Sequence, residues 1–470
     1  MDTTGIQSLI SRISQELGQR LLTSAPLETA WGRLCDAELA EILRQVGLQT
    51  LQYMIDTAVA DEVARHQSAG LTIKHTPTIR YNTIFGPLDL ESPYVWKHGG
   101  LSAKPLRDVV GITHDGRSEA VERALTDFGS EGSFEQAADR FAEHYHYHLS
   151  RTTADRVTKQ AGHEALGYVE RRLSAEMTEG RDAPCHADTI LLGLDGCLIR
   201  TGTFLPASSP PSPTFSLGEA ALIPPDAAIE SPAPTPPRPS SGEPRHKAIH
   251  YTEVRLGFAR PLDEERAADK VFVGKVAGYP DIVQDLKHAA GLVGLTNESK
   301  VVAVADGGNG LREELDRQFA DWNFQFVLDK QHLKDHLYET AEALGIEQAH
   351  RAAWVTPWIE MVNEGAIHYT MAKLQELFDQ TGETRIERLM GYLERFCDAI
   401  DYDDFQDNGL PIGSGEIESA HKSIPQHRLK LPGACWHPDS LNPMMALRIV
   451  RANGWWDEFW EDRTARLLAA

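Results

Sequence analysis

The stretch DTILLGLDGCLIRTG, residues 188 to 202, places a single carboxylate, Asp195, inside an otherwise apolar run. We expect a strand here, the first of three strand-like stretches that belong to one sheet. A carboxylate at such a position is costly to bury unless it binds a cation or another partner. The stretch therefore predicts a buried strand that carries a functional acid.

This strand begins an alternating series. Two further strand-like stretches follow it, and then helical and strand-like stretches alternate. Such alternation predicts parallel strands joined by right-handed crossovers, and hence an α/β fold. We expect strands at 188–202, 250–261, 270–279, 300–306 and 323–329, and helices at 279–295, 309–322 and 330–345.

A proline-rich segment separates the first two of these strands. Residues 206 to 244 hold 12 of the 26 prolines in the chain, together with many serines and alanines. Such a composition buries too little apolar surface to offset the entropy of an ordered chain. We therefore expect a disordered insertion at 205–246 within a hairpin, whose ends stay close because the cost of loop closure rises slowly with length.

A second acid, Asp306, ends the apolar stretch KVVAVAD and is followed by a glycine-rich turn. Its side chain should emerge at the carboxyl edge of the sheet, where ligands collect in open α/β sheets. If the strands of Asp195 and Asp306 are neighbours, their carboxylates lie side by side. A third acid would complete a set of oxygen ligands that suits Mg²⁺ or Mn²⁺ and two-metal phosphoryl transfer. Taken singly, an aspartate at a strand end is usually a turn or cap residue.

The stretch GLPIGSGEIESAHKSIPQHRLK, residues 409 to 430, offers two candidates for the third acid. Glu416 directly follows the glycine turn, where the helix dipole favours a negative charge. Glu418 lies two residues further along and points about 200° around the helix from Glu416. The two carboxylates therefore cannot both face the sheet.

Five stretches carry a family resemblance: LDGCLIRTG (194–202), VVAVADGGNGL (301–311), FVLDKQHLKDHL (326–337), GLPIGSGEIESAHKSIPQHRLKLPGACW (409–436) and ALRIVRANGWWDEFW (446–460). They resemble the signature blocks of bacterial insertion-sequence DDE transposases of the Kra type, whose layout is similar to that of the Mutator-like superfamily. The resemblance runs from about residue 76 to the C-terminus, apart from the proline-rich insertion.

This resemblance implies a ribonuclease-H-like α/β core with an all-α insertion, and a mainly helical N-terminal region that binds DNA. Matched by position, Asp195, Asp306 and Glu418 are implied as the catalytic acids and as the ligands of Mg²⁺ or Mn²⁺. The implied regions are an N-terminal region at 1–175, the first part of the core at 186–340, a helical insertion at 341–408, and the last part of the core with a C-terminal helix at 409–470.

The family pattern also contains an Asp-x-x-His shortly after the second acid, matched here by Asp329 and His332. The resemblance implies that this pair orders the edge of the active site or the displaced DNA strand. Asp329 is in addition a reserve candidate for a metal ligand. The alternative is structural, because an aspartate at this position can simply cap the helix that follows.

Residues 133 to 172 have the layout of a helix-turn-helix. Ser133 and Gln136 form a capping-box pattern, the helix breaks at Ser150, and a second helix is expected with Thr152 or Thr153 at its N-cap. The alternative is a plain pair of antiparallel helices. As a helix-turn-helix, this segment offers candidate DNA contacts at Arg151, Thr152, Arg156 and Lys159.

The formal net charge of −23 gives no global attraction to nucleic acid, so any DNA contact must come from local basic clusters. Such a cluster follows Glu418, and it contains Lys422, Arg428, Lys430, Arg448 and Arg451. We expect Lys422, Arg428 and Lys430 to contact DNA. A solvated basic helix face is the alternative.

The sequence also bears on the compartment. Five scattered cysteines without a C-x-x-C pair fit a reducing environment. There is no signal-peptide pattern and no apolar run of membrane-spanning length. We expect a cytoplasmic protein without a membrane partner, associated with the nucleoid when bound to DNA.

These observations together predict a DDE transposase that acts on the terminal repeats of an insertion sequence and on target DNA. A homo-oligomer, at least a dimer on DNA, is a further expectation from the resemblance, because two element ends must be processed. A ribonuclease-H-like nuclease is one alternative, and it would not need the helix-turn-helix. A non-catalytic, domesticated DNA-binding relative is another, and in it at least one of the acids would face away from the others.

Overall fold

The computed structural model describes residues 3–24, 31–112, 116–174, 185–206, 245–263, 265–308 and 310–469. The chain divides into two compact units. Unit 1 comprises Met1–Ala124 and Asp139–Leu149, and unit 2 comprises Leu125–Ala138 and Ser150–Ala470. The unit that holds the large sheet therefore begins well before residue 175, the expected end of the N-terminal region.

Unit 1 combines two long helices with two small sheets. The strands form sheets of order β1-β4-β5 and β3-β2-β6. Val59 of α2 packs with Ile79 of β2 and Leu88 of β3 in a small apolar core. The elements are α1 (Thr3–Ser24), α2 (Trp31–Ser68), β1 (Thr72–His75), β2 (Thr78–Thr83), β3 (Gly86–Glu91), β4 (Tyr94–Lys97), β5 (Leu101–Ala103), α3 (Pro105–Val110) and β6 (Gly116–Arg117).

Three helices follow: α4 (Glu119–Glu131), α5 (Phe134–Tyr145) and α6 (Arg151–Leu173). The division between the units falls within α4 and again within α5. The predicted capping box is confirmed, since Gln136 N donates to Ser133 Oγ and Ser133 N donates to Gln136 Oε1. The N-cap predicted for α6 at Thr152 or Thr153 is wrong. Ser150 occupies that position, and its hydroxyl accepts a hydrogen bond from Thr153 N.

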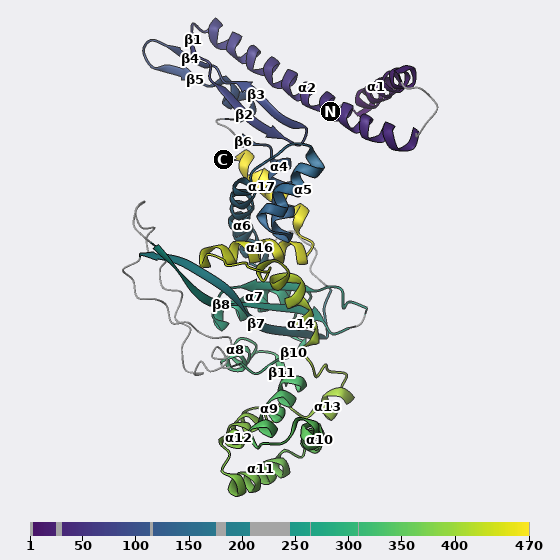
Figure 1. The fold of residues 1–470 in the computed structure, drawn as a ribbon, viewed down its shortest axis with the longest axis vertical. Coiled ribbons are helices and arrows are strands. Elements are labelled where there is room, and N and C mark those ends of the chain that lie inside the picture. Colours follow the sequence, from purple (N-terminus) through teal and green to yellow (C-terminus); the bar gives the residue numbers. More distant parts are fainter. Residues whose placement is uncertain are drawn as a thin grey trace. The chain divides into compact units, whose positions relative to one another are not determined.

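The main sheet of unit 2 has five strands in the order β11-β10-β7-β8-β9 (Figure 1). β7, β8 and β9 pair in antiparallel fashion, whereas β10 is parallel to both β7 and β11. The predicted succession of strands is therefore confirmed, and β10 is a direct neighbour of β7. The strands are β7 (Thr189–Pro206), β8 (Arg245–Pro261), β9 (Val271–Lys275), β10 (Lys300–Ala305) and β11 (Asn323–Leu328).

The hairpin of β7 and β8 encloses the proline-rich segment. Its pairing extends to Pro206 opposite Arg245, so the strands include two residues at each end of the insertion predicted at 205–246. Residues 207–244, on which the prediction of disorder falls, lie outside the described residues.

The remaining helices of unit 2 follow β9 along the chain. They are α7 (Tyr279–Leu292), α8 (Leu311–Gln318), α9 (Lys330–Ala343), α10 (Gln348–Asn363), α11 (Ile367–Thr381), α12 (Thr384–Arg395), α13 (Tyr402–Asp407), α14 (Gly415–His421), a π-helical turn (Lys422–Gln426), α15 (His427–Leu429), a 3₁₀ turn (Pro438–Ser440), α16 (Leu441–Ala452) and α17 (Trp456–Ala469). Helices α9 to α13 gather into one group beside β11 (Figure 1). All of α10 to α13 fall within the expected helical insertion at 341–408.

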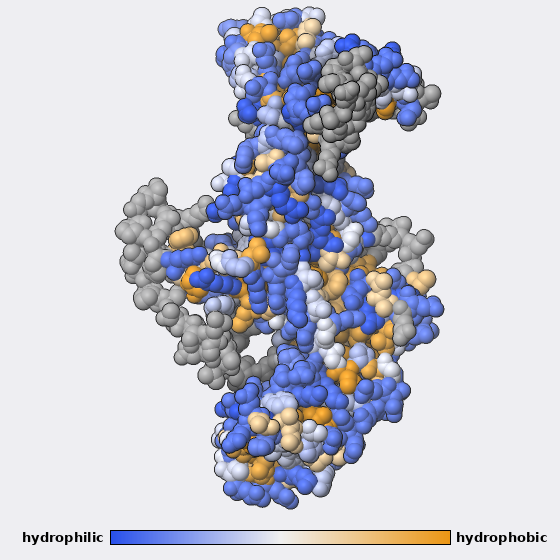
Figure 2. Space-filling model, turned by 45° about the vertical axis from the view of Figure 1, so that its right-hand side comes forward, coloured by the Kyte–Doolittle hydropathy of each residue, from blue (hydrophilic) through white to orange (hydrophobic). Residues whose placement is uncertain are grey.

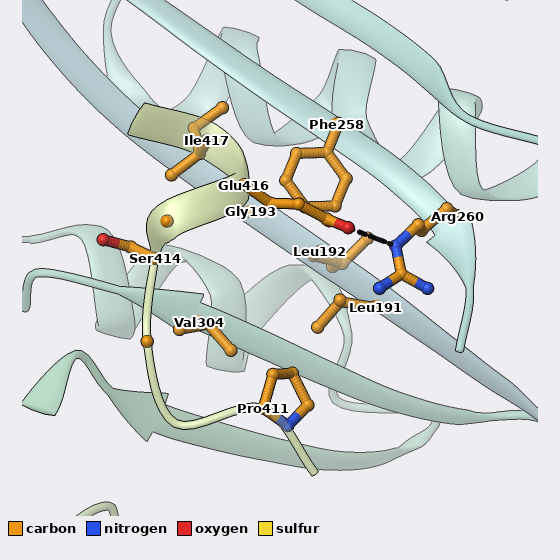
Figure 3. Close-up of a pocket in the computed structure, with 12 residues that line it drawn as sticks. Leu191, Leu192, Gly193, Phe258, Arg260, Val304, Pro411, Ser414, Glu416 and Ile417 are labelled. Carbon is orange, nitrogen blue, oxygen red and sulfur yellow. Dashed lines mark hydrogen bonds and ion pairs between the residues drawn. The ribbon is translucent and has the colours of Figure 1, made fainter. Parts of the chain in front are cut away.

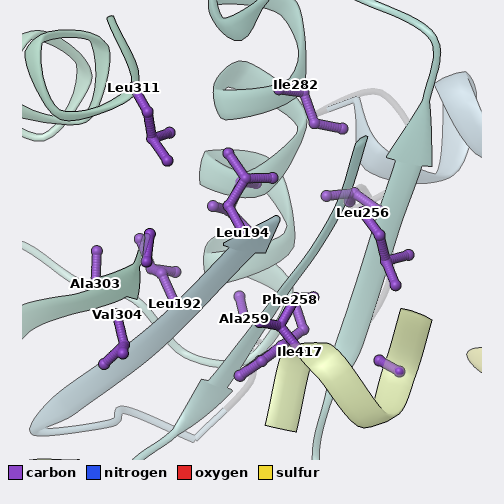
Figure 4. Packing of buried hydrophobic residues seen from close by; sticks show 14 of the residues in the cluster. Leu192, Leu194, Leu256, Phe258, Ala259, Ile282, Ala303, Val304, Leu311 and Ile417 are labelled. Atoms are coloured by element: carbon purple, nitrogen blue, oxygen red, sulfur yellow. The ribbon is translucent and has the colours of Figure 1, made fainter. Parts of the chain in front are cut away.

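Helices cover both faces of the sheet. A β-carbon on Gly257 would lie 3.0 Å from Leu194 Cδ1 and 3.3 Å from Leu286 Cδ1, so α7 packs on the face that carries Leu194. Because side chains alternate along a strand, Phe258 points to the other face, and there it lines a cavity together with Ile417 of α14. The core between these elements is almost entirely aliphatic and aromatic (Figure 4).

The surface agrees with the ordinary composition of the chain. On the face shown in Figure 2, hydrophilic residues predominate and hydrophobic residues form scattered patches. None of the helices in the described ranges combines the length and the apolar character that crossing a membrane requires.

Candidate active site

Asp195 and Asp306 lie at the same edge of the sheet, which is formed where β10 ends, although β7 itself continues beyond Asp195. β10 and β7 run parallel, and their last paired residues are Val304 and Gly193. Each aspartate lies two residues beyond this pair, so the two acids stand at the same level. The sequence predicted this arrangement on the condition that the strands are neighbours, and that condition is met.

The Asp195 carboxylate is partly withdrawn from water and accepts a short hydrogen bond from Gly196 N to Oδ1, at 2.6 Å. Burial raises its pKa to about 6, and the negative charges of Asp306 and Glu418 contribute to the increase. His332 acts in the opposite direction and lowers the pKa. The three predicted acids and His332 are therefore close enough to influence one another electrostatically.

The Asp306 side chain is oriented by the glycine-rich turn that follows it. Oδ1 accepts a hydrogen bond from Gly308 N at 2.9 Å, and the main-chain carbonyl accepts one from the Tyr392 hydroxyl at 3.1 Å. Gly307 has a φ of 77°, and a β-carbon there would lie 2.7 Å from the Phe396 ring. This turn therefore requires glycine for both its conformation and its close packing.

The two glutamates of α14 have different surroundings. Glu416 pairs with Arg260 at 3.0 Å (Figure 3) and with Lys270 at 3.4 Å. Glu418 accepts a hydrogen bond from the Ser414 hydroxyl at 3.1 Å, and its charge acts on Asp195. Of the two candidates, Glu418 is the one that interacts with the aspartates.

Asp329 connects α9 to the turn that precedes α14. It is only 1% exposed, and Oδ1 accepts hydrogen bonds from Gln331 N and His332 N at the start of α9. Its other oxygen accepts a hydrogen bond from Ser414 N at 2.5 Å. The capping alternative therefore describes Asp329, whose two oxygens are both engaged by main-chain amides. It positions the segment that carries Glu418.

A cavity of about 230 Å³ lies beside this turn, between α14 and the sheet (Figure 3). Its walls are mostly apolar, and Arg260 and Glu416 stand at its polar side. None of the three predicted acids lines it. It is therefore separate from the edge where the acids meet.

Three charged or polar side chains of this edge were missed by the sequence analysis. Glu253 and Arg255 lie on β8, and His421 lies on α14. Alternation along HYTEVRLGF places Glu253 and Arg255 on one face of β8, and the pairing of Arg255 with Gly196 makes this the sheet face opposite to the one that carries Asp195. His421 lies three residues after Glu418, and its Nε2 is 3.6 Å from Asp195 Oδ2.

The basic cluster after Glu418 divides into buried and exposed members. Arg428, predicted to contact DNA, is instead only 3% exposed. Its guanidinium group donates to Gly129 O at 2.9 Å and lies between the rings of Phe134 and Trp436, 4.7 and 4.6 Å from their centroids. Burial of this group is the physical reason why the prediction fails for Arg428. Lys422 and Lys430 are exposed, as DNA contacts require.

Two further arginines of the cluster also make hydrogen bonds or ion pairs with other residues of unit 2. Arg448 is 7% exposed and donates to Ser423 O and Ile424 O as well as to Glu131. Arg451 pairs with Asp127 and stacks on Trp456. The three arginines of this cluster therefore contribute mainly to packing within unit 2.

The candidate DNA contacts on α6 lie on a helix with one buried face. Val157 and Ala161 are buried, and a β-carbon on Gly162 would meet Pro443 of α16 at 2.7 Å. Arg151, Thr152 and Arg156 remain exposed. Lys159 is paired with Asp155 at 2.8 Å.

The donor set of this edge suits a hard cation. Within the described ranges, no three His, Cys, Asp or Glu side chains converge closely enough to hold a metal ion. Oxygen donors are nevertheless the ligands that Mg²⁺ and Mn²⁺ prefer. The raised pKa of Asp195 reflects burial and repulsion among carboxylates, which a bound cation would relieve. Asp195, Asp306 and Glu418 carry donors of this kind, although the described geometry does not bring three of them together around one ion.

Comparison with known proteins adds no closer identification. A scan against models of protein families finds no match to this chain, and a search of characterised proteins finds no matching sequence.

Proposed function

We propose that this chain is a divalent-cation-dependent DNA transposase of the DDE class, which cuts the ends of an insertion sequence and joins them to target DNA. The observation that carries the proposal is the approach of Asp195, Asp306 and Glu418 to one edge of the sheet, where the two other acids influence the pKa of Asp195. The acids come from a strand, a loop after a neighbouring strand, and a helix more than a hundred residues later in the chain.

The fold supports the same proposal. Three antiparallel strands in chain order, followed by two strands parallel to the first, support the ribonuclease-H-like core that we propose from the sequence resemblance. The helices α10 to α13 come between the last strand and α14, where that resemblance implies an all-α insertion.

The roles of the individual residues follow from their surroundings. Asp195, Asp306 and Glu418 would hold the cations through carboxylate oxygens, with Gly196 N and Gly308 N orienting the two aspartates. A bound pair of divalent ions would activate the attacking oxygen and stabilise the leaving oxygen of the scissile phosphate. Asp329 keeps the Ser414 turn in place, and Ser414 in turn holds Glu418 by a hydrogen bond.

DNA would be bound through local clusters of exposed basic side chains. Lys422 and Lys430 follow Glu418 closely, and Arg151 and Arg156 are exposed on α6. Phosphate contacts of this kind need no net positive charge of the whole chain. We include in the proposal a homo-oligomer, at least a dimer on DNA, since two element ends must be brought together.

The test is cleavage of a labelled duplex that carries the DNA flanking the gene for this chain, in Mg²⁺ and in Mn²⁺. We expect Asp306→Asn and Glu418→Gln each to lower the cleavage rate by at least roughly 100-fold, because each would remove a cation ligand. Glu416→Gln is the matched control on the same helix and should cleave as the wild-type chain does. Full activity of Asp306→Asn would overturn the proposal.

A nuclease without strand transfer is the second candidate. The packing of α6 against α16 favours it, because that contact occupies one face of a helix expected to read DNA. In this case the same assay would yield cleaved ends that depend on Asp306 but no joined products. A non-catalytic DNA-binding relative would bind the duplex without cutting it in either metal.

A further inference from the structure

The long helix α2 packs on the sheets of unit 1 with one side. Val59 belongs to the small core of this unit, and Leu51 and Ile55 pack against that core. Arg44 lies on the same side, where its guanidinium group donates to Phe85 O at 2.6 Å. Residues that recur every three or four positions share one side of a helix, so these contacts account for a single side of α2.

The other side of α2 carries a stripe of exposed apolar side chains. Leu39, Leu43, Val46 and Tyr53 are between 36% and 73% exposed. Thr50, which is also exposed, completes their spacing of four, three, four and three residues. At about 100° per residue, the stripe lies roughly opposite the side that packs on the sheets. We call these five residues the outer stripe of α2.

The spacing of the outer stripe suits contact with another helix. Steps of three and four residues in alternation give the repeat by which helices pack along one another in coiled coils. The positions that flank the stripe hold uncharged residues, among them Ala40, Ile42, Gln49 and Met54. Two copies of the stripe can therefore meet without bringing like charges together.

The helix α1 carries a second exposed stripe. Leu9, Ile10 and Ile13 are all exposed, and they fall on one side of this helix of 22 residues. Six residues, 25–30, separate α1 from α2, a length that is common between neighbouring helices of a bundle. Since a helix is stable in water when its apolar stripe is buried against another element, one chain brings two stripes that need a partner.

We propose that the outer stripe of α2, together with the stripe of α1, is the interface through which two copies of this chain associate as a bundle of four helices. Each helix of such a bundle buries one apolar stripe, and a second copy supplies two further stripes of the same kind. A twofold interface uses the same patch on both copies, and the uncharged flanks of the outer stripe permit this. A stable interface needs roughly 20 residues on each partner, a number that the exposed sides of α1 and α2 provide.

An anionic membrane surface fits these helices less well than a second copy does. Amphipathic helices that bind membranes are rich in lysine and arginine on their polar side. By contrast, α2 contains no lysine, and three acids, Asp36, Glu38 and Glu41, lie around the start of its outer stripe. The charge of α2 therefore favours a helical protein partner.

The test is the molar mass of the full chain without DNA, measured by sedimentation equilibrium over a range of concentrations. We expect a reversible dimer of the wild-type chain. The double variant Leu43→Glu, Val46→Glu should weaken this dimer by at least roughly 100-fold, because association would bury four carboxylates in an apolar contact. The matched control is the double variant Leu101→Glu, Tyr369→Glu, whose two positions are exposed outside both helices. It should dimerise as the wild-type chain does.

A second variant covers the case in which the double variant does not fold. Thr50→Leu should tighten the dimer roughly tenfold, because each copy then buries a leucine within the stripe in place of a hydroxyl group. Gln45→Leu is its control, since Gln45 is exposed on the same helix but off the stripe, and it should leave the dissociation constant unchanged.

Three outcomes would overturn the inference. They are a wild-type chain that stays monomeric, a double variant at Leu43 and Val46 that folds and dimerises as tightly as the wild type, and a Thr50→Leu variant with an unchanged dissociation constant. A monomeric chain that instead sediments with vesicles of phosphatidylglycerol would assign the stripes to a membrane surface. Because the association concerns the chain without DNA, each result is independent of the DNA cleavage proposed above.

Discussion

The surroundings of Asp195 disfavour the ionised form of its carboxyl group. Burial raises its pKa from 3.8 to about 6, with further contributions from Asp306 and Glu418. Between about pH 4 and about pH 6, the unfolded chain therefore loses this proton while the folded chain keeps it. The free energy of unfolding falls as the pH rises through this window and then stays at the lower value.

We predict that Asp195→Asn stabilises the cation-free protein near pH 7.5 but not near pH 4, because the variant has no charge to bury. The expected gain near pH 7.5 is on the order of 2 kcal/mol, after allowance for solvent screening at a side chain that is 29% exposed. Thermal denaturation in EDTA at a series of pH values measures it. Glu416→Gln should show no such gain, and a wild-type chain as stable as Asp195→Asn near pH 7.5 would contradict the prediction.

At the scale of elements, Asp329 joins two segments that are far apart in the sequence. Its carboxylate accepts three main-chain hydrogen bonds, two from the start of α9 and one from Ser414. We predict that Asp329→Ala lowers the free energy of unfolding by roughly 3 kcal/mol, since it leaves these amides without their acceptor. Denaturation in urea measures this change.

The matched control is Glu383→Ala at the N-cap of α12, where the side chain accepts one hydrogen bond, from Arg385 N. Its expected cost is about 1 kcal/mol or less. Asp329→Ala should also slow DNA cleavage, because Glu418 depends on the position of Ser414. Equal losses of stability in the two variants would show that the Ser414 contact contributes nothing.

Arg428 and Lys430 lie close together in the sequence but have different surroundings. Arg428 fills a space between Phe134 and Trp436, whereas Lys430 is exposed two residues later. We predict that Arg428→Met lowers the free energy of unfolding by roughly 2 kcal/mol, through loss of the ring contacts and of the hydrogen bond to Gly129 O. Lys430→Gln should leave stability unchanged within error. Unchanged stability of Arg428→Met together with weakened DNA binding would restore the original interpretation of this residue.

For the whole molecule, the net charge of −23 limits how the proposed DNA binding can work. Long-range steering is weak, so binding has to rely on a few exposed cations, whose contribution depends on salt. We predict that the double variant Lys422→Gln, Lys430→Gln makes the negative slope of log affinity against log salt concentration shallower by about 2 for duplex DNA. Fluorescence anisotropy over a salt series measures this slope, and the same slope in the wild-type chain and the double variant would exclude both lysines from the interface.

The sequence by itself determined the strands of the main sheet, the hairpin around the proline-rich segment and the capping box at Ser133. These features depend on local periodicity and on strand order, which can be inferred from the sequence. The tertiary structure alone decided which charged side chains are buried. Arg428 shows the reason, because its partner Gly129 is 299 residues away in the sequence and no local pattern records that contact.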